Sequence, residues 1–508
     1  MNDVKNIEDC LNQDVELDER LSEDLLIKRE NPEYQAMLEK RKKLPAYEKR
    51  NEIVKAVQEN QVIVIKGETG CGKTTQVAQF LLDSYIESKQ GSVFHAICTQ
   101  PRRLAAIAVA QRVAQERCEA CGSSLSSAVG YQIRLECRSP RKRGSILYCT
   151  TGILLQFLQS DPYLENVSHL LLDEVHERDV LSDFILTVVR DLLPKRPKLR
   201  VILMSATINA DMFSNYFSNC PSIDIPGLTF PVQEVYLEDI LTLLDFRVRP
   251  KCAKRFRPLP GSPSHKEDVE YTKFIVPYVE ELEAKRSYPC HVTKSLRMRE
   301  SEESPDELIM ELLHHISTQE GPGAILVFLS GWEQISRLHR SLTSDRLFST
   351  SRFLILPLHS MMPTTSQRQV FDRPARGTRK IILSTNIAET SLTIDDIVYV
   401  IDTGRTKQSG FDAKKNLSTL QAEWIAQANA RQRKGRAGRV QAGVCYRLYT
   451  RFRQQSMVAH PIPEMHRMRL EEVILRIKIL KLGQVKVLIF LWPEKLITGS
   501  TAHYVQRN

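Results

Sequence analysis

Residues 67–74 read Gly-Glu-Thr-Gly-Cys-Gly-Lys-Thr, a pattern typical of a phosphate-binding loop. Glycines allow the backbone to wrap around a polyphosphate, and free amides at a helix N-terminus favour its negative charge. In this pattern Lys73 contacts the β- and γ-phosphates, and the Thr74 hydroxyl can ligate Mg²⁺. The sequence therefore predicts a nucleoside triphosphate site made of Gly67, Glu68, Thr69, Gly70, Cys71, Gly72, Lys73, Thr74 and Thr75.

The flanking residues predict the elements that this loop needs. The apolar, β-branched run at 62–65 indicates a buried parallel strand before the loop. Residues 75–88 place apolar side chains at helical spacing, which indicates a helix after it. An accidental glycine-rich turn would lack both neighbours, so strand, loop and helix together favour nucleotide binding.

A second acidic site follows another apolar run at 170–172. Acidic residues at the carboxyl end of a parallel strand face the ligand-binding edge of the sheet. Asp173 is therefore expected to hold Mg²⁺ through its water shell, with Glu174 also near the metal. Glu174 is the better candidate to orient and deprotonate an attacking water. A charged strand end without function is common, but its pairing with the phosphate loop favours catalysis.

The sequence Asp-Glu-Val-His at 173–176 resembles the DEAH-box signature of superfamily 2 helicases, with valine in the usual alanine position. Further family motifs follow in order. They are Thr-Gln-Pro-Arg-Arg at 99–103, Thr-Thr-Gly at 150–152, Ser-Ala-Thr at 205–207, Ser-Thr-Asn-Ile-Ala-Glu-Thr-Ser at 384–391 running on to Asp395, and Gln-Arg-Lys-Gly-Arg-Ala-Gly-Arg at 432–439. The resemblance implies an α/β fold of two tandem RecA-like P-loop domains with parallel sheets and a nucleotide in the interdomain cleft.

Within that family the chain most resembles the RHAU-like helicases, which resolve guanine quadruplexes. The stretches that carry this finer resemblance are 67–80, 144–152, 160–164, 219–221 and 422–424.

The resemblance also implies roles for individual residues. Lys73, Asp173, Glu174, His176, Gln432, Arg436 and Arg439 are the expected catalytic residues, the last two as arginine fingers. Ser391 and Asp395 are expected in the nucleotide network, and Arg112 and Phe371 on either side of the base. Arg102, Arg103, Thr151 and Thr385 resemble residues that hold a nucleic-acid backbone. A basic run such as 433–436 is ordinarily a solvated loop, but its spacing with glycines and Gln432 favours the motif.

The chain divides into four predicted parts. Residues 1–45 form a polar extension, 46–228 a first RecA-like domain, and 229–450 a second, with a variable insertion at about 247–266 expected as a loop. Residues 451–508 form a tail. Its apolar face of Leu470, Val473, Ile474, Ile477 and Leu480 resembles the opening helix of a winged-helix domain, and the resemblance ends after Gly483. The tail therefore indicates a truncated form in which this face lacks a partner and a protein could bind it.

Composition agrees with a nucleic-acid partner. The 508 residues carry a formal charge of +10, which favours a polyanion because lysine and arginine release counterions from phosphates. The longest late apolar run, 485–492, is too short to span a bilayer, so we expect no membrane partner. Eleven scattered cysteines suit a reducing compartment, and the resemblance implies the nucleus, the cytoplasm or both.

These features predict an ATP- and Mg²⁺-dependent helicase that moves 3′ to 5′ along single-stranded or structured RNA, by resemblance to the family. DNA, guanine quadruplexes and other nucleoside triphosphates stay open as substrates. Two alternatives also stay open: a nucleic-acid-binding module with weak turnover, and a regulatory form without unwinding.

Overall fold

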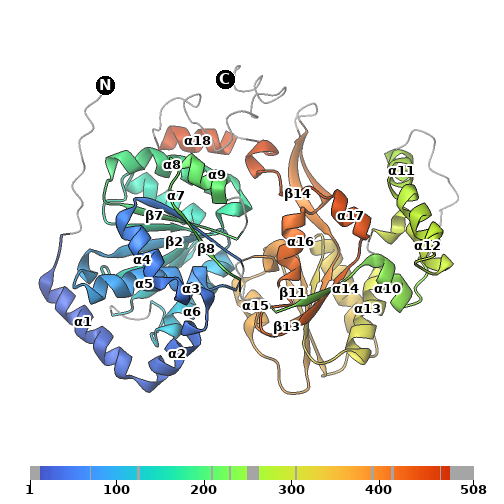
Figure 1. The fold of residues 1–508 in the computed structure, drawn as a ribbon, viewed down its shortest axis with the longest axis horizontal. Helices are drawn as coiled ribbons and strands as arrows, with labels where there is room; N and C mark the ends of the chain where they lie inside the picture. Colours follow the sequence, from blue (N-terminus) through green and yellow to red (C-terminus); the bar gives the residue numbers. More distant parts are fainter. Residues whose placement is uncertain are drawn as a thin grey trace. The chain divides into compact units, whose positions relative to one another are not determined.

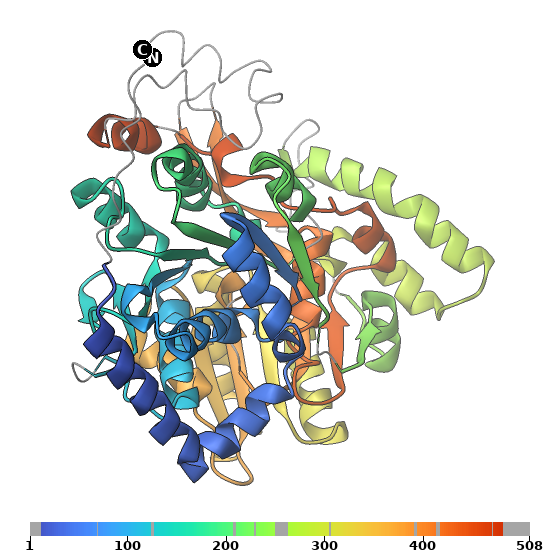
Figure 2. The same ribbon diagram turned by 60° about the vertical axis from the view of Figure 1, so that its left-hand side comes forward.

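The computed structural model describes residues 12–68, 70–122, 126–206, 210–227, 230–248, 263–303, 306–390, 394–412, 417–469 and 471–480. The chain forms two compact units. The first contains Met1–Leu228, Ser409–Thr419 and Ile462–Asn508, and the second contains Thr229–Gln408 and Leu420–Pro461. Figures 1 and 2 show each unit as a sheet flanked by helices. Of the predicted site residues, Thr69 and Ser391 lie outside the described residues, as does Thr207 of the Ser-Ala-Thr motif.

The first unit is built on an eight-stranded sheet in the order β4-β3-β5-β2-β6-β7-β1-β8, in which every neighbouring pair is parallel except β3 and β4. The strands are β1 (Val62–Gly67), β2 (His95–Gln100), β3 (Val129–Ile133), β4 (Glu136–Arg138), β5 (Ser145–Thr150), β6 (His169–Leu172), β7 (Arg200–Ser205) and β8 (Ser222–Ile225). Its helices are α4 (Arg50–Glu59), α5 (Lys73–Glu87), α6 (Arg103–Glu116), α7 (Thr151–Ser160), α8 (Val180–Leu192) and α9 (Ala210–Tyr216).

Helices cover both faces of this sheet. One core packs Phe80 of α5 and Val113 of α6 against the strands, and the other packs Leu154 of α7 and Phe184 of α8. A parallel sheet buried on both faces needs strands that are apolar throughout, which is why the runs at 62–65 and 170–172 do not alternate with polar residues. The expected parallel α/β fold is confirmed.

Three helices precede α4: α1 (Val15–Glu30), α2 (Pro32–Lys42) and α3 (Pro45–Glu48). Asp14 caps α1, since its side chain accepts a hydrogen bond from the Leu17 amide. Proline begins α2 and α3, where its missing N–H costs nothing and its fixed φ suits the first turn. Leu21 and Leu25 of α1 are buried in the first core, so this polar extension belongs to the first unit.

The second unit has a six-stranded, all-parallel sheet in the order β11-β12-β10-β13-β16-β9. The strands are β9 (Val232–Val235), β10 (Ala324–Phe328), β11 (Phe353–Leu358), β12 (Arg379–Ser384), β13 (Ile397–Asp402) and β16 (Gly443–Arg447). Its helices are α10 (Leu237–Leu243), α11 (Pro263–Ala284), α12 (Cys290–Leu296), α13 (Asp306–Gln319), α14 (Trp332–Ser344), α15 (Thr364–Arg368), α16 (Gln427–Lys434) and α17 (Arg451–Ser456). A separate hairpin joins β14 (Arg405–Asp412) to β15 (Leu417–Trp424).

The predicted loop at 247–266 is only partly described. Residues 249–262 lie outside the described residues, but α11 begins at Pro263, so positions 263–266 are helical. Proline at the start of α11 is compatible with helix because the first turn needs no amide donor there. None of the helices that the structure describes is both long and apolar enough to cross a lipid bilayer.

The apolar face of the tail has a partner within the chain. Helix α18 (Glu471–Ile479) buries Val473 and Ile477 in the second core of the first unit, where Leu480 also packs. The expectation of an uncovered face is therefore wrong for these residues, because a hydrophobic stripe on a helix is stable only when it packs. Leu475 and Ile479, on the other side of α18, are exposed, and Leu470 lies outside the described residues.

We expect Ile477→Ala to lower the free energy of unfolding by about 2–5 kcal/mol, because it leaves a cavity in a packed core. Leu475→Ala is the matched control: its side chain is 57% exposed, against 0% for Ile477, and its effect should stay within about 0.5 kcal/mol. Urea unfolding followed by circular dichroism measures both. Equal effects of the two substitutions would show that α18 does not pack as described.

Candidate active site

Four neighbouring strands of the first unit end at the candidate site. In the sheet order β2-β6-β7-β1, the parallel strands end at Gln100, Leu172, Ser205 and Gly67. Asp173 directly follows β6, and the phosphate-binding loop directly follows β1. Open α/β sheets bind ligands at the carboxyl ends of their strands, so this edge is the expected place for a nucleotide.

The loop has the conformation that its glycines permit. Gly70 and Gly72 have φ values of 91° and 93°, a region that favours glycine. A Cβ at Gly67 would lie 2.7 Å from the Cys71 Sγ atom, so a larger residue here would require the Cys71 side chain to shift. Helix α5 begins at Lys73, which is buried, and the Thr75 hydroxyl donates to the Gly72 carbonyl over 3.3 Å. Glu68 is exposed.

Cys71 is a structural residue of this loop. Its side chain is buried, and burial raises the pKa of the thiol above its usual value. A thiol rather than a thiolate is therefore present at neutral pH, which makes Cys71 unreactive.

Asp173 joins the strand end to the loop. Its Oδ2 atom accepts hydrogen bonds from the Thr74 hydroxyl at 2.7 Å and from Gln100 Nε2 at 2.8 Å. Burial and the charge of Glu174 raise the pKa of Asp173 to about 6, although Lys73, Thr74 and Gln100 act in the opposite direction. A hydroxyl and a carboxylate in direct contact form the hard oxygen donor set that Mg²⁺ prefers, so these residues fit that cation.

Glu174 and His176 follow Asp173 in a tight turn. Glu174 is buried and has a φ of 55°, an uncommon conformation for a residue with a side chain. The His176 Nδ1 atom accepts the Ala206 amide at 3.2 Å and therefore carries no proton. Glu174 Oε2 lies 3.4 Å from this nitrogen, and because both atoms are acceptors this approach is neither a hydrogen bond nor an ion pair. His176 thus links the turn to the end of β7.

The predicted nucleic-acid residues of the first unit lie on the neighbouring strand ends. Arg102 forms an ion pair with Glu177 at 3.3 Å, and Arg103 is exposed at the start of α6. The Thr151 hydroxyl is 3.5 Å from the carbonyl of Gln100, the residue that also contacts Asp173. One strand end therefore contacts both a predicted nucleic-acid residue and the predicted metal ligand.

Arg112, predicted to contact the base, lies on α6. Its Nε atom donates to Glu116 Oε1 at 2.8 Å, and about half of its side chain is exposed.

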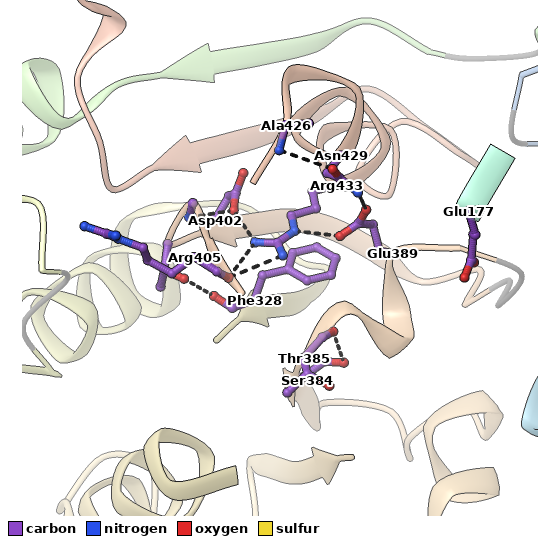
Figure 3. A network of polar contacts seen from close by, with 12 residues as sticks. Glu177, Phe328, Ser384, Thr385, Glu389, Asp402, Arg405, Ala426, Asn429 and Arg433 are labelled. Atoms are coloured by element: carbon purple, nitrogen blue, oxygen red, sulfur yellow. Dashed lines mark hydrogen bonds and ion pairs between the residues drawn. The ribbon is translucent and has the colours of Figure 1, made fainter. Parts of the chain in front are cut away.

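In the second unit a buried arginine organises the two expected motifs. The Arg433 side chain is fully buried and donates to Glu389 Oε2 at 3.0 Å and to Asp402 Oδ1 at 2.8 Å (Figure 3). Asn429 also donates to Glu389, and the guanidinium lies 4.8 Å from the centre of the Phe328 ring. Burial alone would lower the pKa of Arg433, but the two carboxylates raise it, so the group is charged.

The other predicted residues of the second unit differ in their exposure to solvent. Arg436 is buried just after α16, Gln432 and Arg439 are half-buried, and Thr385 is buried at the end of β12. Phe371 is half-buried at the end of a short 3-10 helix (Gln369–Phe371), and Asp395 is exposed. A Cβ at Gly438 would lie 2.6 Å from the Phe230 carbonyl oxygen, so this glycine allows the motif to pack on the chain before β9.

Sequence reasoning missed five residues of these networks. Gln100, Glu389 and Arg433 were included in motifs but given no role of their own, and Asp402 and Asn429 were not named. The signal for the three motif residues was their type: an amide, a carboxylate and a guanidinium must find partners when they are buried.

We expect Arg433→Met to lower the free energy of unfolding of the second unit by about 3–5 kcal/mol, because it leaves the buried Glu389 without its arginine and removes one of the two arginines that pair with Asp402. Arg431→Met, an exposed position on the same helix, should change it by less than about 0.5 kcal/mol. Chemical denaturation monitored by tryptophan fluorescence is suitable, because Trp332 and Trp424 lie in this unit. An Arg433→Met protein as stable as the control would mean that the network contributes nothing to the fold.

Comparison with known proteins identifies the family. Residues 47–214 match the DEAD/DEAH box helicase domain, and residues 306–441 match the helicase conserved C-terminal domain. The ATP-dependent DNA/RNA helicase DHX36 of Homo sapiens is 52% identical over 477 residues, covering 92% of this chain and 47% of that protein. The DExH-box ATP-dependent RNA helicase DExH1 of Arabidopsis thaliana is 47% identical, covering 88% of this chain and 44% of that protein.

A putative ATP-dependent RNA helicase of Homo sapiens, DHX57, is 43% identical over 90% of this chain and 35% of its own length. The chain thus spans less than half the length of these relatives. Both conserved helicase domains and the ordered motifs lie within it, and the chain therefore belongs to the DEAD/DEAH-box helicase family, in its DEAH-box branch.

Proposed function

We propose that this chain is an ATP-dependent RNA helicase that moves 3′ to 5′ and also accepts DNA or guanine quadruplexes. The observation that carries the proposal is the contact of the Thr74 hydroxyl with Asp173, beside the buried Lys73. It brings the two motifs that phosphoryl transfer requires to one sheet edge. The relative DHX36 is an ATP-dependent DNA/RNA helicase, which supports the choice of substrates.

The residues of the first unit supply distinct functions in this proposal. The loop amides and Lys73 bind the phosphates, and Thr74 and Asp173 hold Mg²⁺, which would offset charge on the phosphate oxygens. Glu174 orients the attacking water and accepts its proton, and burial strengthens that interaction because water screening is lost. His176 accepts the Ala206 amide and so ties the turn that follows Glu174 to the end of β7.

The second unit supplies positive charge. Arg436 and Arg439 are the proposed arginine fingers, which stabilise charge on the γ-phosphate. Arg433 does not share that role, because its guanidinium already binds Glu389 and Asp402 within the unit. It instead holds α16, and with it the segment that carries Arg436, against β13.

Arg102, Arg103 and Thr151 are the proposed contacts to the nucleic-acid backbone, with Thr385 as their counterpart in the second unit. Gln100 connects this group to the catalytic edge, since its carbonyl faces Thr151 and its side chain donates to Asp173. A strand bound at Thr151 would therefore act on the position of Asp173 through a single residue.

We expect Glu174→Gln to reduce RNA-stimulated ATP turnover by about 10²–10⁴-fold, because it removes the general base. Nucleotide affinity should be retained, because the phosphate contacts are unchanged. Asp191→Asn, an exposed carboxylate on α8, is the matched control and should keep full turnover. Steady-state hydrolysis with and without single-stranded RNA measures this. Rapid hydrolysis by Glu174→Gln would contradict the assignment, and RNA binding without turnover in the unmodified chain would favour a binding module.

For strand separation, we expect a duplex with a 3′ single-stranded overhang to be unwound, and one with a 5′ overhang to remain paired. A fluorescence-quench assay with ATP distinguishes them, and Lys73→Ala serves as the inactive control. Equal unwinding of both duplexes would overturn the proposed direction.

A further inference from the structure

The polar extension before β1 reaches the phosphate-binding loop. The Ala46 amide, on α3 directly after the extension, donates a hydrogen bond of 2.9 Å to the Cys71 carbonyl. A Cβ at Gly72 would lie 3.1 Å from the Leu44 Cδ1 atom, so the extension packs directly on the loop backbone. Figure 1 shows α1, α2 and α3 on the side of the first unit that contains α5 and α6.

A buried polar junction lies behind this contact. Arg41 of α2 donates through Nε to Gln76 Oε1 at 2.8 Å, and Gln76 is three residues into the helix that follows the loop. Gln76 and Gln79 both donate to Glu116 Oε2, at 2.7 and 2.9 Å. Arg41 itself lies 3.9 Å from the same oxygen. These four side chains are at most 2% exposed.

The second oxygen of Glu116 serves another residue. Its Oε1 atom accepts the hydrogen bond from Arg112, whose side chain leaves the junction and reaches solvent. Glu116 therefore lies between three groups: Arg41 on α2, the two glutamines on α5, and the partly exposed guanidinium of Arg112 on α6. A single buried carboxylate sets the position of all three.

Stability alone does not account for such a junction. Removing a carboxylate and a guanidinium from water costs several kcal/mol per ion, and a packed apolar cluster of similar volume is often as stable. Hydrogen bonds to charged groups are directional, and the planar guanidinium of Arg41 can bond Gln76 in only one orientation. The junction therefore restricts its side chains to one arrangement. The elements it restricts are the ones proposed to hold the phosphates and the base.

We propose that Arg41 and Glu116 are positioning residues of the nucleotide site: Arg41 sets the phosphate-binding helix from the extension, and Glu116 orients Arg112 toward the base. The extension is thus a working part of the nucleotide site rather than a linker. This inference rests on the proposed function, because the role of Arg112 belongs to it.

The first test is direct nucleotide binding by Arg41→Gln. Dissociation constants for a fluorescent ATP analogue and for unlabelled ATP in competition should rise about tenfold, the equivalent of ~1.4 kcal/mol. The rise should appear in KM, with kcat at saturating ATP within about twofold of the unmodified chain, because the groups that contact the reacting atoms are unchanged. Lys42→Gln is the matched control: this neighbouring cation is exposed, pairs only with Glu39 among its described contacts, and should leave affinity unchanged.

Unchanged affinity in Arg41→Gln would overturn the role of the extension, as would equal weakening by Lys42→Gln. If Arg41→Gln does not fold, Gln76→Met removes the same junction from the side of α5 and should weaken binding similarly. Normal affinity in that variant would also overturn the proposal.

The second test separates base from phosphate. Arg112→Ala should weaken ATP binding but leave competition by inorganic tripolyphosphate within about twofold, since tripolyphosphate has no base. Glu116→Gln should do the same, because its amide oxygen can still accept from Gln76 and Gln79 while its NH₂ group cannot accept from Arg112. Their effects on ATP should not add in the double variant, because both act through one guanidinium. Additive effects, or equal losses for ATP and tripolyphosphate, would overturn the role of Glu116.

The tests also distinguish this inference from the proposed function. Both measure equilibrium binding, so they give a result even if the unmodified chain shows no RNA-stimulated turnover. In that case the helicase assignment would fail while the junction could still be shown to position the nucleotide. Normal turnover with no effect of any junction variant would sustain the helicase and refute the junction.

Discussion

The hydrogen bond between Thr74 and Asp173 is the interaction on which the first unit depends. It joins the first turn of α5 to the end of β6, two strands away from β1 in the sheet. The contact requires the parallel order β6-β7-β1 and a loop whose glycines adopt positive φ. Burial makes the arrangement costly, since it raises the pKa of Asp173, and the donors around this carboxylate partly offset that cost. The fold thus holds a carboxylate in a buried position that disfavours its charge, at the place where the proposed reaction needs a ligand for Mg²⁺.

In the second unit, a buried arginine rather than a buried carboxylate holds the motif segments in place. Arg433 lies in the motif that also contains Arg436 and Arg439, yet it faces two carboxylates of its own unit. Asp402 ends β13, and Glu389 follows the 3-10 helix Asn386–Ala388, so one guanidinium holds two motif segments together. Its bonds are charge-assisted and directional, which limits how far these segments can move apart. Of the three arginines in this eight-residue motif, Arg433 is therefore structural, and Arg436 and Arg439 are the ones proposed to act in catalysis.

Local sequence patterns predicted the parts of the fold that depend on neighbours in the chain. The strand at 62–65, the glycine loop and the following helix are such parts, and the structure has them as β1, the loop and α5. The contact of Gln100 with Asp173 could not be predicted, because it depends on β2 lying beside β6, and all buried parallel strands look alike in sequence. The packing of α18 was missed for a related reason: an apolar stripe shows that a helix packs, but does not identify its partner.

The polar extension shows the same limit for charged residues. Its composition predicted a polar extension, and arginine and aspartate are seldom buried alone. Asp18 and Arg41 are nevertheless buried, because the Ser92 amide donates to one and the other donates to Gln76. Both partners are far away in the sequence, so no local pattern reveals them. A buried charged group with all its partners adds little net stability, but an arrangement in which a partner is missing costs several kcal/mol. Charged residues in this chain therefore determine how its elements are oriented, while its apolar residues determine that they pack.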